Sequence, residues 1–169
     1  MSRAFTKEPE GDQAADELPC RQQSPHPNYA TPAGLNLLRA RVAEIRAEHD
    51  RLKHAVGDPG TAGRLRAVER DLRYLLDRVE TAIVVDPATQ PRDKALFGAR
   101  VTTVDKNGVK RTFTIVGEDE AKAGAGKVSW VSPLAKAIIG HRVGDVVLWT
   151  RPAGELDLEI TAIEYPVQG

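Results

Sequence analysis

The sequence predicts an α+β fold with two parts: an antiparallel helical hairpin, followed by a small antiparallel sheet that carries one short helix. Three observations predict it. Apolar residues recur at heptad spacing on both sides of a Gly- and Pro-rich break at residues 57–63. After residues 86–94 the apolar period shortens to two, as in strands. In the second part, "SPLAKAIIG" at 132–140 begins and ends with residues that start and stop helices.

The composition excludes several classes of protein. The chain has 169 residues, which is room for one large domain or two small ones. Its 24 Lys and Arg residues balance 24 Asp and Glu residues, and aromatics make up only 5%, which argues against a dedicated DNA binder or a base-stacking surface. There is neither an apolar run of the roughly 18 residues that span a membrane nor a secretory signal. With a single cysteine, Cys20, we expect a cytoplasmic protein without membrane contact.

Residues 1–30 are polar and Pro-containing, and show neither helical nor strand periodicity, so we expect a disordered acidic tail. Acidic residues outnumber basic ones in it: Glu8, Glu10, Asp12, Asp16 and Glu17 against Arg3, Lys7 and Arg21. Two roles stay open for this tail, as a solubilising segment or as a segment that becomes ordered on a partner.

Residues 31–85 are predicted to form an antiparallel coiled-coil hairpin. Thr31 is a good N-cap, and Pro32 is well placed at the first helical position. The apolar seams are Leu38, Val42, Ile45, His49, Leu52 and Val56 in one helix, and Leu65, Val68, Leu72, Leu75, Val79 and Ala82 in the other. We expect His49, the polar member, to set the register rather than bind a ligand. The arms should be roughly 30–40 Å long.

Residues 86–94 are predicted to be a linker, because Pro87 stops the second helix. Residues 95–169 form the second domain, in which Asn107–Gly108 favours a hairpin turn and Ser132 caps the short helix. Strands are expected at residues 99–105, 110–117, 127–132, 145–150 and 156–166.

The sequence contains no clear catalytic or metal-binding constellation. The four histidines are scattered, and no Ser-His-Asp, Cys-His or phosphate-loop pattern occurs. Glu118, Asp119 and Glu120 follow a predicted strand, and we expect a solvated acidic turn there or, alternatively, a contact for a basic patch on a partner. We therefore expect a non-enzymatic protein with no metal site and no cofactor of its own.

Long stretches of the chain resemble a known family. They are "RLRAVERDLRYLLDRVETAIVVDP", "FGARVTTVDKNGVKRTFTIVGEDEA" and "VSWVSPLAKAIIGHRVGDVVLWTRPAGELDLEITAIEYP". These stretches are similar to the Gre family of bacterial transcription elongation factors, and the run from "RLRAVERDLRYL" resembles GreB more than GreA. The resemblance covers residues 29–166. It implies an FKBP-like second domain that grips the β′ coiled coil at the rim of the RNA polymerase secondary channel, with the hairpin pointing down the channel.

The same resemblance implies where the chemistry would lie. In the family, two acidic residues at the hairpin tip help to hold the second Mg²⁺ of the polymerase, which then cleaves backtracked RNA. The tip here reads "VGDPGTAG". Asp58 corresponds to one acidic residue and is the sole catalytic candidate, whereas Thr61 stands where the other carboxylate belongs. The hairpin also looks about a dozen residues shorter than the family's, so each arm loses about 9–10 Å.

The charge of the tip argues against metal recruitment. Between Asp50 and Arg66 there are four basic residues against two acidic ones, the basic residues being Arg51, Lys53, Arg64 and Arg66. A basic tip repels Mg²⁺ and attracts phosphate or acidic protein. We therefore expect a Gre-type factor that regulates elongation without full stimulation of transcript cleavage.

The resemblance places the polymerase-binding residues around the short helix. Ser132 and Pro133 match the family's Ser-Pro, Ala135 and Lys136 follow as in the family, and Val131 replaces an Asp or Asn. Capping of the helix is the alternative role of Ser132. We expect a monomer whose contact with nucleic acid is indirect, through the elongation complex.

Three alternatives stay open. The chain is an active cleavage factor that uses Asp58, or it resembles the regulators of nucleoside diphosphate kinase, which have a shorter hairpin on the same fold. The third is an FKBP-like prolyl isomerase, although Trp130 and Trp149 have few other aromatics near them in the sequence to line such a pocket.

Overall fold

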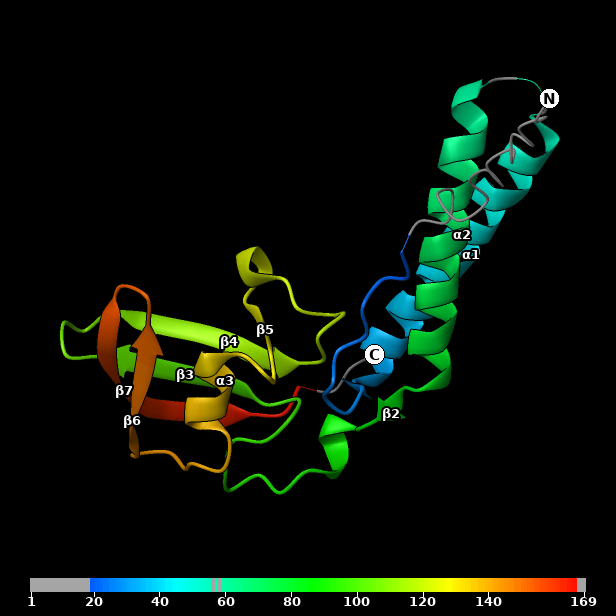
Figure 1. Cartoon of the computed structure of the whole chain (residues 1–169). Coiled ribbons are helices and arrows are strands. Elements are labelled where there is room, and N and C mark those ends of the chain that lie inside the picture. Colours follow the sequence, from blue (N-terminus) through cyan, green and yellow to red (C-terminus); the bar gives the residue numbers. More distant parts are fainter. Residues whose placement is uncertain (1–18, 56, 58, 167–169) are drawn as a thin grey trace, which may run out of the picture.

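The computed structural model describes residues 19–55, 57 and 59–166. It shows a long two-helix hairpin that rises from one end of a curled sheet (Figure 1). The predicted α+β class is confirmed. Among the described residues, no helix is long and apolar enough to span a membrane.

The hairpin consists of α1 (Pro32–His54) and α2 (Pro59–Glu80). With 23 and 22 residues, these helices are about 33–35 Å long. Thr31 caps α1 as predicted, since its hydroxyl oxygen accepts a hydrogen bond from the Gly34 N–H at 2.9 Å. Most of the predicted seam is confirmed, except for Leu65 and Ala82, by one buried cluster between the helices: Leu38, Val42, Ile45, Val68 and Leu75, with Leu52, Leu72, Tyr74 and Val79 packed against it. Val56 lies outside the described residues.

His49 lies in the seam and faces the opposite helix. Its side chain is 16% exposed, and its Nε2 is 3.3 Å from Glu69 Oε1 on α2. This contact joins the two helices at one polar position of the seam, as expected for a residue that sets the register.

The base of the hairpin contains a small parallel sheet that sequence periodicity did not reveal. β1 (Tyr29–Ala30) pairs with β2 (Ile83–Val84), which follows α2. Asn28 supports this pairing, because its side-chain amide donates to the Arg78 carbonyl at 2.8 Å and to the Thr81 hydroxyl at 3.0 Å. Residues 28–30 are therefore ordered, whereas the sequence assigned them to the disordered tail.

The second domain contains a five-stranded sheet with the strand order β5-β4-β3-β7-β6. The strands are β3 (Arg100–Asp105), β4 (Lys110–Val116), β5 (Lys127–Ser129), β6 (Val146–Arg151) and β7 (Gly154–Glu164). The pairs of neighbours are antiparallel except for β4 and β5, which are parallel. The prediction of a purely antiparallel sheet is wrong at this edge, because residues 117–126 carry the chain back before β5 begins.

Local side-chain capping sets the β3–β4 turn and the short helix that starts after Asp86, where the Asp86 carboxylate accepts from the Ala88 N–H at 2.8 Å. In the β3–β4 turn, the Asp105 carboxylate accepts from the N–H groups of Asn107 and Val109 at 2.9 and 3.0 Å, and Gly108 has a φ of 78°. The linker contains η1 (Pro87–Thr89), and η2 (Ala123–Ala125) precedes β5.

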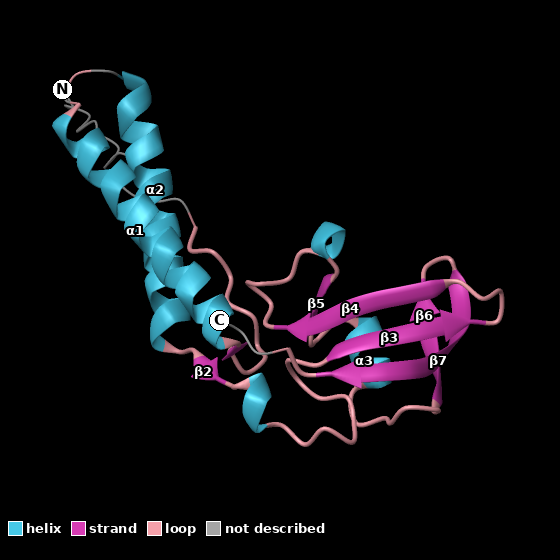
Figure 2. Cartoon of the chain, turned by 180° about the vertical axis from the view of Figure 1, so that it is seen from behind, coloured by secondary structure: helices cyan, strands magenta, loops and turns pink. Residues whose placement is uncertain are grey.

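The core of the domain lies between the sheet and α3 (Pro133–Ile138), which packs on one face (Figure 2). The buried core side chains include Val101, Phe113, Ile115, Ile138, Val147, Leu158 and Ile160, and Val128 of β5 packs against them partly buried. Tyr165 closes the end of the core, where its hydroxyl donates to the Lys94 carbonyl at 2.7 Å. The opposite face of the sheet carries the alternate side chains, and none of the described helices lies over it (Figure 2).

Candidate functional site

The turn before α3 presents the first set of predicted site residues. The hydroxyl oxygen of Ser132 accepts a hydrogen bond from the Ala135 N–H at 3.2 Å, and its backbone has the extended conformation of an N-cap. Pro133 occupies the first helical position and is exposed. Capping uses the acceptor side of the Ser132 hydroxyl and leaves its hydrogen able to donate, so a cap and a contact with a partner are compatible.

The exposure of these residues decides which of them can touch a partner. Pro133 and Lys136 are exposed and lie one turn apart, and Val131 and Ser132 are half-buried beside them. Ala135, in contrast, is 0% exposed and belongs to the domain core. The prediction of Ala135 as a contact residue is therefore wrong for its side chain, which anchors α3 to the sheet.

The N-terminal segment reaches this turn through aromatic contacts. Trp130 immediately precedes Val131, and its ring lies edge-on to Tyr29 at 5.0 Å and to His26 at 5.9 Å between ring centroids. The contacts join residues about a hundred positions apart, which sequence periodicity cannot reveal. They connect the turn before α3 with the strand at the base of the hairpin.

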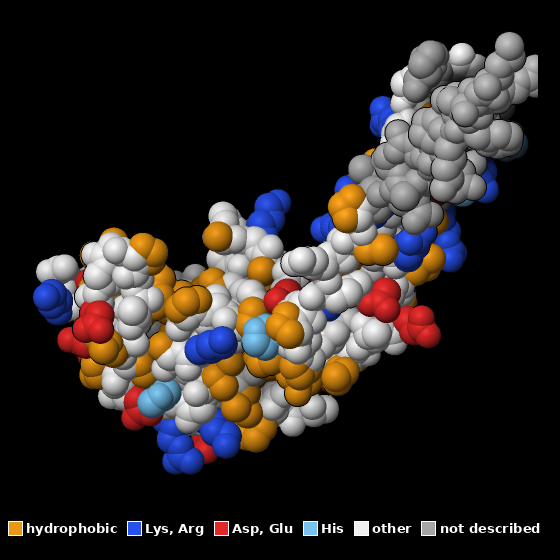
Figure 3. Space-filling view, in the orientation of Figure 1, with side chains coloured by type: hydrophobic (Ala, Val, Ile, Leu, Met, Phe, Trp, Pro, Cys, Tyr) orange, Lys and Arg blue, Asp and Glu red, His pale blue; other side chains and the backbone are white. Residues whose placement is uncertain are grey.

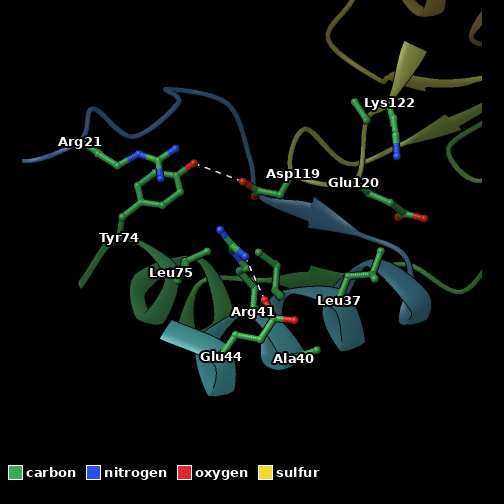
Figure 4. Close-up of a pocket in the computed structure, with 12 residues that line it drawn as sticks. Arg21, Leu37, Ala40, Arg41, Glu44, Tyr74, Leu75, Asp119, Glu120 and Lys122 are labelled. Carbon is green, nitrogen blue, oxygen red and sulfur yellow. Dashed lines mark hydrogen bonds and ion pairs between the residues drawn. The ribbon is translucent and has the colours of Figure 1, made fainter. Parts of the chain in front are cut away.

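The acidic turn at 118–120 is not a solvated turn, and this prediction is wrong. Asp119 Oδ2 accepts from Arg78 Nε at 2.6 Å, and the Arg78 side chain is only 4% exposed. The Tyr74 hydroxyl donates to the other oxygen of Asp119 at 3.2 Å, as Figure 4 shows. Burial, together with the charge of Asp119, raises the pKa of the Tyr74 phenol above its usual value.

Glu120 makes the second connection between the domains. Its buried carboxylate accepts from the Thr31 hydroxyl at 2.6 Å and pairs with Lys127 Nζ at 3.0 Å. Gly34 on α1 leaves room for this carboxylate, since a Cβ there would lie 2.5 Å from Glu120 Oε2. Thr31 thus caps α1 and ties its first turn to the sheet domain.

These connections were missed because they bring together residues far apart in the chain. The position of Arg78 beside the seam residue Val79 gives no signal of its burial, since Arg41 and Arg46 also flank seam residues and are exposed. We name Arg78, Asp119, Thr31, Glu120 and Lys127 the base network.

An open cavity of ≈ 560 Å³ lies between α1, α2 and the 118–122 turn (Figure 4). Arg21 borders it and packs over the Tyr74 ring at 4.1 Å. Exposed Leu37 and the ion pair of Arg41 with Glu44, 2.9 Å apart, line its α1 side. Charges of both signs alternate around this cavity, and in the described part of the chain no three His, Cys, Asp or Glu residues gather to hold a metal.

The hairpin tip lies at the far end of the molecule from the turn before α3 (Figure 1). α1 ends with Arg51, Lys53 and His54 in its last turn, and Gly57 has a φ of 122° in the connection to α2. Thr61 is half-buried in the first turn of α2. Asp58 lies outside the described residues.

The described acidic residues near the tip already have partners. Arg64 contacts Glu48 Oε1 with two nitrogen atoms, at 2.9 and 2.6 Å, across the two helices. Asp50 Oδ1 is 3.4 Å from His49 Nδ1. Figure 3 shows Lys and Arg side chains at several separate places on the visible face rather than in one continuous patch. The tip can thus present cationic side chains, but it offers no free pair of described carboxylates.

Comparisons with known proteins place the chain in a family. A family model described as "Transcription elongation factor, GreA/GreB, C-term" matches residues 90–165. Transcription elongation factor GreB of Neisseria meningitidis serogroup B is 35% identical over 153 residues, which cover 82% of this chain and 94% of the relative. Transcription elongation factor GreA of Sphingopyxis alaskensis is 34% identical over 145 residues, which cover 78% and 92%. A solved GreA/GreB structure from Nitrosomonas europaea has 20% identity and a TM-score of 0.41, and covers 81% of this chain and 97% of that one.

Proposed function

The chain belongs to the GreA/GreB family of transcription elongation factors, and from this premise we propose that it binds bacterial RNA polymerase and regulates elongation without full stimulation of transcript cleavage. In this proposal the second domain grips the β′ coiled coil at the secondary channel. The hairpin enters the channel, and contact with nucleic acid is indirect. We propose a monomeric, cytoplasmic factor that is not an enzyme and carries no cofactor of its own.

The surface around α3 supports the docking half of the proposal. Pro133 is a rigid exposed apolar residue at the start of a helix, and Lys136 places a cation one turn further along the same exposed side. Val131 and Ser132 complete this surface, which we name the docking turn. Because α3 is anchored in the core by Ala135 and Ile138, the docking turn is presented with little freedom to move.

The charge of the hairpin tip is the observation that supports the other part of the proposal, that the chain does not fully stimulate transcript cleavage. Two metal ions in a phosphoryl transfer need hard oxygen ligands, and a factor that recruits Mg²⁺ must supply carboxylates. The last turn of α1 supplies Arg51 and Lys53 instead, and Glu48 is engaged by Arg64. A single carboxylate, Asp58, so near these two cations in the sequence, is a weak ligand for the Mg²⁺ of the polymerase active site.

The base network connects the hairpin to the second domain, and so relates the position of the tip to that of the docking turn. Arg78–Asp119 and Thr31–Glu120 join the hairpin to the domain that carries the docking turn. A factor that docks with one domain and acts with the tip of the other needs a fixed angle between them. The proposal therefore gives the base network the role of aiming the hairpin.

Binding to the cognate RNA polymerase tests the docking half. We expect Lys136→Glu to weaken binding to immobilised polymerase by about tenfold, because it reverses a charge at the interface. Lys106→Glu is the matched control, since Lys106 is an exposed lysine in the β3–β4 turn. If both variants bind as tightly as the parent chain, the docking turn is not the polymerase contact.

A further inference from the structure

The outer edge of β6 is an unprotected sheet edge. β6 is the last strand in the sheet and pairs only with β7 in the described part of the chain. Its side chains alternate: Val147 is buried against the core, whereas Val146 and Leu148 are 63% and 50% exposed on the opposite face. Exposed apolar strands with free backbone groups at an edge are usually covered or broken by charges. β6 contains no proline, and its single charged residue is Arg151 at its last position, where it packs over the Trp149 ring.

An acidic row lies beside these apolar side chains on the same face of the sheet. Glu159 stands opposite Val146, Asp157 opposite Leu148 and Glu155 opposite Thr150. Directly paired residues in an antiparallel sheet share a face. All three carboxylate residues are exposed, and in the described chain none of them forms an ion pair. They repeat about every 7 Å along β7, so they repel one another without compensation.

We propose that the edge of β6 binds an extended protein segment that carries Lys or Arg at alternate positions, as a sixth strand. Such a segment would satisfy the free backbone groups of β6 at a spacing of about 4.8 Å. The aliphatic stems of its Lys or Arg side chains would cover Val146 and Leu148. Their charged ends would then reach Asp157 and Glu159 on the strand beyond, since these side chains pack along apolar surface and extend their charge outward.

A second copy of the chain does not fit this edge equally well. The side chains that a second β6 would bring to this face are Val146, Leu148 and Thr150, none of which is a cation. The β7 carboxylates of both copies would stay uncompensated. The partner segment must therefore supply the positive charge.

The β6 site is separate from the docking turn. α3 packs on the core face of the sheet, and the apolar and acidic rows lie on the other face. This inference consequently goes beyond the proposed function, and the two can fail independently of each other.

Titration of the full chain, labelled with ¹⁵N, with two capped octapeptides tests the site. One peptide alternates Lys and Val, and the other alternates Glu and Val. We expect the Lys peptide to shift the backbone amides of β6 and β7, and the Glu peptide to leave them unchanged. Replacing Asp157→Asn together with Glu159→Gln should weaken the Lys peptide by about tenfold, and so should salt raised to about 0.5 M. Asp77→Asn with Glu80→Gln, on exposed α2, is the matched control and should change nothing.

Several results would overturn the proposal. The first is a Lys peptide that shifts no β6 amide, and the second is a Glu peptide that binds as well as the Lys peptide. The third is a concentration-dependent dimer in sedimentation experiments that Leu148→Lys abolishes, because that result assigns the edge to a second copy.

Discussion

The two ends of the hairpin differ in how their charges are used. At the base, the side chains of Arg78 and Glu120 are 4% and 2% exposed, and each has a partner on the other domain within 3 Å. At the tip, Arg64 is 68% exposed, and its ion pair with Glu48 stays within the hairpin. Charge at the base is thus structural, since it holds two domains together, whereas charge at the tip is available to a partner. In the proposed function, the base is the part that aims the hairpin and the tip is the part that acts.

The largest effect should follow from breaking the base network at its most buried charge. Arg78→Ala leaves the partly buried Asp119 carboxylate without its cation, and we expect a loss of about 3 kcal/mol in the free energy of unfolding. Urea denaturation followed by circular dichroism measures it. Arg73→Ala is the control on the same helix, because Arg73 is exposed. Equal losses in the two variants would mean that buried Arg78 contributes no more to the free energy of unfolding than exposed Arg73 does.

Two helical glycines allow the same Gly→Ala substitution to be compared at the base of the hairpin and near its tip. A Cβ on Gly34 would meet Glu120 Oε2 at 2.5 Å, whereas a Cβ on Gly63 has nothing within 4 Å. Gly34→Ala should therefore destabilise the fold by about 1–3 kcal/mol. Gly63→Ala should stabilise it by about 0.5–1 kcal/mol through helix propensity. Melting temperatures that move in the same direction for both variants would contradict the difference between base and tip.

A smaller effect, confined to alkaline solution, should come from Tyr74. Burial and Asp119 raise the pKa of its phenol, so the folded state favours the protonated form. The stability that this provides is fully present below the ordinary phenol pKa of about 10 and is lost as the pH rises through the raised value. Tyr74→Phe should flatten the fall in stability above about pH 10. Asp119→Asn should lower the Tyr74 pKa in a titration of tyrosinate absorbance, and an unchanged value would contradict the contact.

The smallest effect belongs to the ion pair at the tip. A double-mutant cycle of Arg64→Ala and Glu48→Ala should give a coupling energy of at most about 0.5 kcal/mol, because exposed pairs are screened by water and salt. The coupling should vanish in about 1 M salt. A coupling energy larger than the loss of unfolding free energy in Arg78→Ala would mean that charges at the tip stabilise the fold more than charges at the base.

Local patterns in the sequence predicted most of the fold. The heptad seam identifies both helices because its spacing is a property of each helix alone, and Thr31, Pro32, Ser132 and Pro133 mark helix starts by short-range capping. Pairings between distant residues were not predictable in this way. The β1–β2 strand pair and the parallel β4–β5 edge depend on where the chain returns in space.

The same limit applies to the candidate site. The basic character of the tip can be read directly from residues 51–66, whereas Asp119 and Glu120 look like a solvated turn until Arg78 and Thr31 are brought beside them. Ala135 illustrates the reverse case. A motif places it in the docking turn, but helix geometry points its side chain into the core.

In the proposed function, the hairpin tip occupies the polymerase channel without recruiting a metal ion. RNA cleavage in a stalled, backtracked elongation complex of the cognate polymerase, with Mg²⁺ and labelled RNA, tests this most directly. We predict that the protein does not shorten the RNA faster than polymerase alone, and that it suppresses the cleavage stimulated by a GreB-type factor in a dose-dependent way. Faster cleavage that is lost in Asp58→Ala would contradict the account.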